Sequence, residues 1–244
     1  VKDLLLGEDK DFILETQSIL KNWHNSDVIF ICNPNNPTGT LTPRETIVEI
    51  VEQAAKAGKM VVVDEAFIDF IKERQDYSVA DLVTSFPNLF VLYSLTKFFA
   101  IPGLRLGLGF GSPDIIRKLD EIRDPWNVNC FAQLAGIHSI SDKEYARSTV
   151  NYISEQKDYL YSGIKSIKGL KPYYPSANYI FVNIEETGFT SAEITEFLGK
   201  AGILVRDCSS YKNLRPVFIR TAVKKHEDNK RLLETLHEIR RKHI

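Results

Sequence analysis

Lys97 is the residue whose surroundings most suggest chemistry. It follows the hydroxyls of Ser94 and Thr96, just after the apolar run 89–93, and precedes Arg105 by eight positions. An amine at a strand end, flanked by hydroxyls and a guanidinium, can bind a phosphate with one part and attack a carbonyl carbon with another. We therefore expect Lys97 to react with an aldehyde that also carries a phosphate group.

A carboxylate ends a second apolar run. Asp64 follows residues 60–63, which are apolar enough to indicate a strand buried on both faces of a parallel sheet. A buried carboxylate needs a partner, and besides a helix cap this can be a protonated ring nitrogen. Such a pair, about 4 Å apart, gains about 4 kcal/mol at an effective dielectric constant of about 20. Pyridoxal 5'-phosphate combines aldehyde, phosphate and ring nitrogen, and is the cofactor that we predict.

Two further side chains could complete such a site. Asn36 lies in the proline-rich loop 33–39, where its amide could donate to a phenolate oxygen, although alone it is an ordinary turn residue. Arg220 ends the apolar run 217–219 and could bind a substrate carboxylate, with a structural salt bridge as the alternative. The joint occurrence of these residues supports the functional interpretation.

Other motif interpretations lack their required partners. Asp64-Glu65 resembles the metal-binding end of a nucleotide-hydrolase strand, but the sequence has no Gly-x-x-x-x-Gly-Lys-Ser/Thr loop. Ser94-x-x-Lys97 matches the first element of a serine acylase, without Ser-Asp-Asn or Lys-Thr-Gly. Gly107-x-Gly-x-Gly lacks the dinucleotide-binding spacing and indicates close backbone packing.

Alternating strand-like and helix-like segments predict an α/β fold that brings the strand ends together. We predict a large cofactor-binding domain over 1–145 with a mostly parallel sheet, a connecting helix over 146–168, and a small α+β domain over 169–244. The predicted strands are 28–32, 60–63, 89–93, 106–110, 179–184, 203–206 and 217–220. The predicted helices include 43–57, 113–121, 143–167, 191–201 and 226–242.

Composition excludes several classes of function. The 244 residues carry a formal net charge of −1, which gives no electrostatic reason to expect nucleic acid or an anionic membrane as partner. No apolar run approaches the roughly 20 residues that span a bilayer. Three scattered cysteines and five histidines without ligand spacing predict neither disulfides nor a metal site, and we expect a cytoplasmic protein.

Four motifs, at 33–39, 64–67, 94–97 and 103–107, carry a family resemblance. In order and spacing they resemble the fold type I pyridoxal-phosphate enzymes of the aminotransferase class I/II branch, over essentially the whole chain. The resemblance implies that Lys97 forms an imine with the cofactor and that the protein is a homodimer. The other implied contacts are Asn36 to the phenolic oxygen, Asp64 to the ring nitrogen, Ser94, Thr96 and Arg105 to the phosphate, and Arg220 to the substrate α-carboxylate.

Two groups of enzymes within that branch remain as alternatives. Histidinol-phosphate aminotransferases share most of the layout, whereas the segments 64–70, 96–103, 125–129 and 206–210 look more like L-threonine-O-3-phosphate decarboxylases of cobalamin biosynthesis. Phe67 stands where many aminotransferases have Tyr, which fits the decarboxylase better. Arg206 is then a candidate for the phosphate or carboxylate of a small phosphorylated amino-acid substrate.

The resemblance also implies a segment before Val1 that carries a glycine-rich phosphate loop and an aromatic residue at the cofactor ring. The sequence contains neither. We therefore expect either a piece of a longer protein or a site completed by a second chain. A cofactor-binding but inactive fragment is a third hypothesis.

Overall fold

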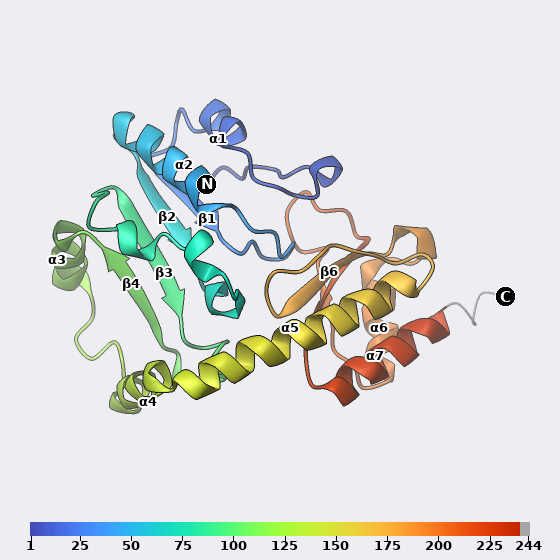
Figure 1. The fold of residues 1–244 in the computed structure, drawn as a ribbon. Coiled ribbons are helices and arrows are strands. Elements are labelled where there is room, and N and C mark those ends of the chain that lie inside the picture. Colours follow the sequence, from blue (N-terminus) through green and yellow to red (C-terminus); the bar gives the residue numbers. More distant parts are fainter. Residues whose placement is uncertain (240–244) are drawn as a thin grey trace. The chain divides into compact units, whose positions relative to one another are not determined.

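The computed structural model describes residues 1–239 and contains two compact units, each with its own sheet (Figure 1). Unit 1 comprises Val1–Asn35 and Leu41–Val150, and unit 2 comprises Asn36–Thr40 and the residues from Asn151 onward. This confirms the predicted α/β class with a second, smaller sheet. The predicted domain boundaries at 145 and 168 stay a prediction.

The sheet of unit 1 has the order β1-β2-β3-β4. Its strands are β1 (Val28–Cys32), β2 (Met60–Asp64), β3 (Leu89–Ser94) and β4 (Gly107–Gly111). The first three strands are parallel, and β4 pairs antiparallel with β3. The carboxyl ends of β2 and β3 therefore lie next to each other, which is where ligands bind in open α/β sheets.

One face of this sheet forms the core of unit 1. Helix α2 (Arg44–Lys56) packs there with Ile47 and Ile50, which are fully buried together with Val61 of β2 and Val91 of β3. The register places Asp64 opposite Leu92, and Ser94 follows two residues later. Because strand side chains alternate between faces, Asp64 and Ser94 lie on the same face, opposite to the core.

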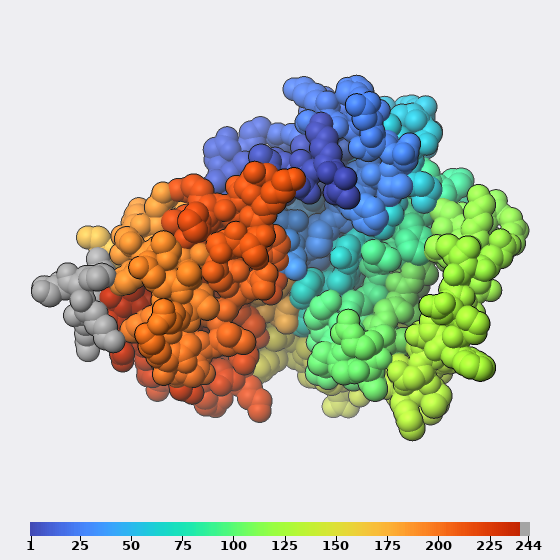
Figure 2. All heavy atoms as spheres, turned by 180° about the vertical axis from the view of Figure 1, so that it is seen from behind, coloured from blue at the N-terminus to red at the C-terminus, as the bar shows by residue number. Residues whose placement is uncertain are grey.

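Three further helices complete unit 1. They are α1 (Thr16–Asn22), α3 (Pro113–Ile122) and α4 (Cys130–Ser141), of which α1 was not predicted. The segment with α3 and α4, yellow-green in Figure 2, lies at the edge of unit 1. Helix α4 leaves several apolar side chains exposed, namely Phe131, Leu134 and Ile137.

Unit 2 contains an antiparallel sheet of order β5-β6-β8-β7. The strands are β5 (Lys171–Pro172), β6 (Tyr179–Asn183), β7 (Arg206–Asp207) and β8 (Phe218–Ala222). The strand predicted over 203–206 begins only at Arg206. The reason is that Ile203 N–H still donates to the carbonyl of Leu198 at the end of a helix, 2.9 Å away.

Helices cover one face of the second sheet. The 24-residue α5 (Lys143–Ser166) begins in unit 1 and continues into unit 2. Helices α6 (Ser191–Lys200) and α7 (His226–Glu238) pack with it around buried Ile180 and Ile219. The end predicted for the last helix, at 242, lies outside the described residues. None of the described helices is long and apolar enough to span a membrane.

Candidate functional site

The predicted site residues fall into two groups. Asp64, Ser94, Thr96, Lys97 and Arg105 belong to unit 1, whereas Asn36, Arg206 and Arg220 belong to unit 2.

Asp64 is the last residue of β2 and is half-buried. Its Oδ1 accepts a hydrogen bond from the backbone N–H of Ala66, 3.0 Å away. Among the described residues nothing donates to the second carboxylate oxygen. One oxygen thus caps the turn after the strand, and the other is available for a cationic N–H donor.

Lys97 lies in the turn that follows β3. Its Nζ is 5.2 Å from the centroid of the Phe67 ring, and no carboxylate of the described chain pairs with it. An amine without an ion-pair partner can attack a carbonyl carbon once it has lost its proton. The position of Lys97 over a ring, rather than beside an acid, suits a nucleophile.

A tyrosine from a distant part of the sequence fixes this turn. The hydroxyl of Tyr145 in α5 donates to the carbonyl oxygen of Phe98 at 2.9 Å. The Phe98 ring also packs edge-on against Phe70, with centroids 5.1 Å apart. Sequence reasoning missed Tyr145, because nothing in its local pattern relates it to a residue 47 positions earlier.

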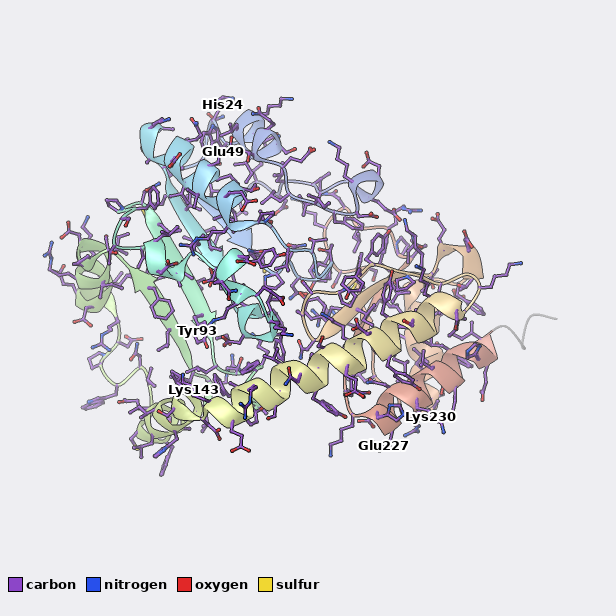
Figure 3. All side chains as sticks on the ribbon, viewed as in Figure 1. His24, Glu49, Tyr93, Lys143, Glu227 and Lys230 are labelled. Atoms are coloured by element: carbon purple, nitrogen blue, oxygen red, sulfur yellow. The ribbon has the colours of Figure 1, made fainter. Side chains whose placement is uncertain are left out.

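A second tyrosine holds the end of β3. Tyr93, labelled in Figure 3, donates its hydroxyl to the carboxylate of Asp69, which also pairs with Arg74 at 2.6 Å. Burial, together with the charge of Asp69, raises the pKa of Tyr93. Tyr93 therefore remains a protonated donor, and it directly precedes Ser94.

Glu65 anchors the segment that carries Phe67. Its side chain is almost fully buried and accepts hydrogen bonds from Ser78 Oγ at 2.7 Å and from the backbone N–H of Val79 at 2.8 Å. Burial raises the pKa of Glu65, although these two bonds oppose the change. The residue after Asp64 thus has a structural role.

The candidate phosphate-binding groups lie close to Lys97 in sequence. Ser94 Oγ and Thr96 Oγ1 are 2.7 Å apart and hydrogen-bonded to each other. Arg105 is exposed and has a left-handed backbone (φ 54°), and its Nη1 donates to the carbonyl of Pro102 at 3.0 Å. Two hydroxyls and a guanidinium are donors that suit a phosphate.

A loop with two anchors carries Asn36. At its base, Asn33 donates its backbone N–H to the carbonyl of Asp64 at 2.9 Å and exchanges two hydrogen bonds with the backbone of Thr42. The tip, Asn36–Thr40, belongs to unit 2, where Ser176 N–H donates to the Gly39 carbonyl at 3.2 Å. The side chain of Asn36 therefore has its described contacts in unit 2.

Asn36 accepts two hydrogen bonds through one atom. Its Oδ1 receives the hydroxyl of Tyr211 at 3.1 Å and Nη1 of Arg220. The Arg220 guanidinium also lies 5.0 Å from the centroid of the Tyr179 ring. Arg220 lies in the middle of β8 rather than at its end, since Thr221 and Ala222 continue the pairing with β6.

Arg206 and Arg220 are direct partners in the pairing of β7 with β8. Arg206 donates from Nη2 to Ser210 Oγ at 2.8 Å, and its guanidinium lies 5.9 Å from the ring of Tyr211. Within the described chain neither arginine forms an ion pair with a carboxylate. Like charges directly opposite each other destabilise a sheet, so this arrangement is suited to an anionic ligand.

The described residues contain no group of three histidine, cysteine or acidic side chains that could hold a metal ion. Cys32, Cys130 and Cys208 form no disulfide in the described part of the chain. Burial raises the pKa of the Cys208 thiol to about 11.

Known proteins resemble the chain over nearly all of its length. A putative threonine-phosphate decarboxylase of Caldanaerobacter subterraneus is 37% identical over 96% of this chain, and a histidinol-phosphate aminotransferase of Methanosphaera stadtmanae is 34% identical over 93%. The chain spans 63% and 60% of their respective lengths. The structure of the histidinol-phosphate aminotransferase from Clostridium acetobutylicum superimposes with a TM-score of 0.91 at 28% identity, covering 97% of this chain and 70% of that one.

The family model described as "Aminotransferase class I and II" matches residues 9–236, a range that includes both candidate groups. By its sequence and its fold, the chain belongs to the aminotransferase class I and II family.

Proposed function

We propose that this protein catalyses the pyridoxal-phosphate-dependent decarboxylation of L-threonine O-3-phosphate to (R)-1-amino-2-propanol O-phosphate, a reaction of cobalamin biosynthesis. The observation that carries the proposal is the pair Arg206 and Arg220. These arginines are direct partners on the adjacent strands β7 and β8, and neither pairs with a carboxylate of the described chain. Threonine phosphate has two anionic groups, a carboxylate and a phosphate, and so offers one to each guanidinium. The 37% identity to a putative threonine-phosphate decarboxylase supports the same substrate.

The donor set of unit 1 fits pyridoxal phosphate. Lys97 would supply the amine that bonds to the aldehyde carbon, and the unbonded oxygen of Asp64 would accept the ring N–H. Ser94, Thr96 and Arg105 would donate to the phosphate. The proposed donor to the phenolic oxygen is Asn36, which belongs to unit 2. When bound, the cofactor supplies a protonated ring that withdraws electrons from the substrate α-carbon.

The residues of the chain would decide which bond breaks. Electrons flow into a ring only from the bond that stands perpendicular to it, so a decarboxylase must place the carboxylate there. In our proposal Arg220 holds the carboxylate, Arg206 holds the phosphate, and together they fix this orientation. Lys97 would then return a proton to the α-carbon.

An aminotransferase of the histidinol-phosphate type is the second candidate. It is favoured by the 34% identity to one such enzyme and by the TM-score of 0.91 with the structure of another. In that reaction Lys97 would take a proton from the substrate α-carbon and would not return it to that carbon, whereas in the decarboxylation it only delivers a proton there. Release of carbon dioxide from threonine phosphate, compared with ketoglutarate-dependent transfer of the amine from histidinol phosphate, separates the two candidates.

Covalent labelling tests the role of Lys97 independently of turnover. We expect borohydride to fix pyridoxal phosphate to Lys97 and to leave Lys97→Ala unlabelled at the corresponding peptide. Lys72→Ala, which removes an exposed amine of unit 1, is the matched control and should label like the unsubstituted protein. An unlabelled Lys97 contradicts the proposal, and labelling without either reaction would identify the inactive fragment.

We also propose that the protein is a homodimer and that α4 contributes to the interface. Phe131, Leu134 and Ile137 expose 73%, 56% and 63% of their surface along one helix. Single exposed apolar residues are common, but several on one helix are typical of an interaction surface. Leu134→Asp should shift the sedimentation coefficient to that of a monomer. Leu204→Asp, at a leucine of unit 2 that is 89% exposed, should leave the dimer intact. A monomeric unsubstituted protein would contradict this proposal.

A further inference from the structure

We propose that the hydroxyl of Tyr211 is a positioning group, which holds the Asn36 amide in the orientation that Arg220 needs when it binds a substrate carboxylate. The inference rests on the proposed function, because it concerns the same two-arginine group.

Two backbone hydrogen bonds, one to each peptide group of Tyr211, fix its position. Its N–H donates to the carbonyl of Cys208 at 3.1 Å, and its carbonyl accepts from the N–H of Leu214, also at 3.1 Å. From this turn the phenol reaches Asn36, which lies 175 positions earlier in the sequence. A side chain whose backbone is held in this way is suited to fixing the position of a neighbouring side chain.

The chemistry of the three groups fixes the orientation of the amide. Arginine is only a donor, so Arg220 must face the carbonyl oxygen of Asn36 and not its NH₂ group. The hydroxyl of Tyr211 donates to the same oxygen. Nδ2 of Asn36, for which no partner occurs in the described chain, is thereby left free to donate to a ligand.

A bound carboxylate is compatible with this arrangement. A carboxylate takes two parallel N–H groups of a guanidinium, and the five N–H groups of Arg220 leave one for its bond to Asn36. The bond from Tyr211 does not involve Arg220 and persists. We infer that Tyr211 keeps Asn36, and through it the Arg220 guanidinium, in place in the ligand-bound state.

The ring of Tyr211 has a separate neighbour. It lies 5.9 Å from the guanidinium of Arg206, which is also held by Ser210. Tyr211→Phe keeps this ring and removes only the hydroxyl. The substitution therefore acts on the Asn36 and Arg220 side of the group and leaves the Arg206 side unchanged.

Calorimetric titration of the full chain tests the inference with three probes. O-phospho-L-threonine carries both anions, L-threonine carries only the carboxylate, and phosphoethanolamine carries only the phosphate. We expect Tyr211→Phe to weaken the two carboxylate probes by about three- to tenfold, the equivalent of one hydrogen bond. Phosphoethanolamine should bind within about twofold of the unsubstituted protein.

A double-mutant cycle separates positioning from a general loss of structure. If Tyr211 acts through Asn36, then Tyr211→Phe should have no further effect on binding in an Asn36→Ala background. Tyr174→Phe is the matched control, since it removes a tyrosine hydroxyl of unit 2 that donates to Asp158 at 3.2 Å. It should bind all three probes normally.

The outcomes are distinct. Unchanged binding of threonine by Tyr211→Phe overturns the inference alone, as does additivity of the two substitutions or an equal loss in Tyr174→Phe. Failure of the unsubstituted protein to bind O-phospho-L-threonine overturns both this inference and the proposed substrate. Selective, non-additive weakening supports the positioning role.

Discussion

The amine of Lys97 lies over the face of the Phe67 ring, with 5.2 Å between Nζ and the ring centroid. An aromatic face attracts an ammonium group but offers no hydrogen bond to a neutral amine. The ring therefore holds the charged form weakly, far less than a carboxylate would. This arrangement holds the Lys97 amine against the ring, and no carboxylate of the described chain pairs with it.

Replacing this ring should therefore favour covalent attachment of the cofactor. At neutral pH we expect Phe67→Leu to increase the fraction of Lys97 bound to pyridoxal phosphate by about two- to fivefold, the equivalent of about 0.5–1 kcal/mol. Absorbance titration with the cofactor measures this fraction. Phe86→Leu, in the core of unit 1, is the control and should not change it. A weaker attachment in Phe67→Leu would show that the ring acts on the cofactor instead.

The buried carboxylate of Glu65 should make stability depend on pH. Because burial raises its pKa above the ordinary value of 4.5, the folded state binds the proton more tightly than the unfolded state. This contribution is fully present below pH 4.5 and is lost as the pH rises through the raised value. The free energy of unfolding of Glu65→Gln should therefore compare least favourably with that of the unsubstituted protein near pH 4, and the difference should be smaller near pH 7.

Urea unfolding between pH 4 and pH 8 measures this difference. We expect Glu65→Gln to cost no more than about 1 kcal/mol at acidic pH, because the protonated carboxyl, like the amide, keeps one acceptor oxygen for the N–H of Val79 and one donor for the hydroxyl of Ser78, and to cost less or to stabilise the protein as the pH rises. Glu52→Gln, on the exposed side of α2, serves as the control. A difference that grows with pH would contradict the direction of the pKa change.

Local sequence patterns were sufficient for most of the elements. The strands at Val28–Cys32, Met60–Asp64 and Leu89–Ser94 coincide with short apolar runs bounded by turn residues. Burial on both faces, which such runs predict, was wrong, because only alternate residues are buried and Phe30 remains 73% exposed. The strand at Arg206–Asp207 was placed too early because the apolar residues Ile203 and Leu204 lie in the turn after α6 instead. Hydrophobicity alone does not distinguish these cases.

The places of Asp64 at the end of β2 and of Lys97 after β3 could be predicted from the apolar runs that precede them, whereas their roles stay a prediction. The candidate site was not predictable where it depends on contacts between segments distant in sequence. Tyr211 reaches Asn36 over 175 positions and Tyr145 reaches Phe98 over 47, and neither tyrosine differs locally from a surface residue. The tertiary fold creates such pairs, so a single sequence contains no spacing that reveals them.

The contact of Tyr145 with the Lys97 turn leads to a prediction of its own. Tyr145→Phe removes the donor to the carbonyl of Phe98 and should destabilise the protein by about 1 kcal/mol. It should also slow the reaction of Lys97 with pyridoxal phosphate in a stopped-flow measurement. Tyr152→Phe removes a hydroxyl of the same helix that accepts from the N–H of His226 at 3.2 Å. If both variants slowed the reaction equally, the effect would belong to α5 as a whole.

The thiols should differ strongly in reactivity. The thiolate is the reactive form, and burial raises the pKa of Cys208 to about 11, even though the nearby charges of Arg206 and Arg220 oppose the change. At pH 8 we expect iodoacetamide to modify the exposed Cys130 at least about 100-fold faster than Cys208, as followed by peptide mass spectrometry. Cys130→Ser should leave Cys208 unmodified until urea unfolds the protein. Fast modification of Cys208 in the folded state would mean that the sheet carrying the two arginines opens readily, and the arginine pair could not then be the fixed anion-binding group that the proposed function requires.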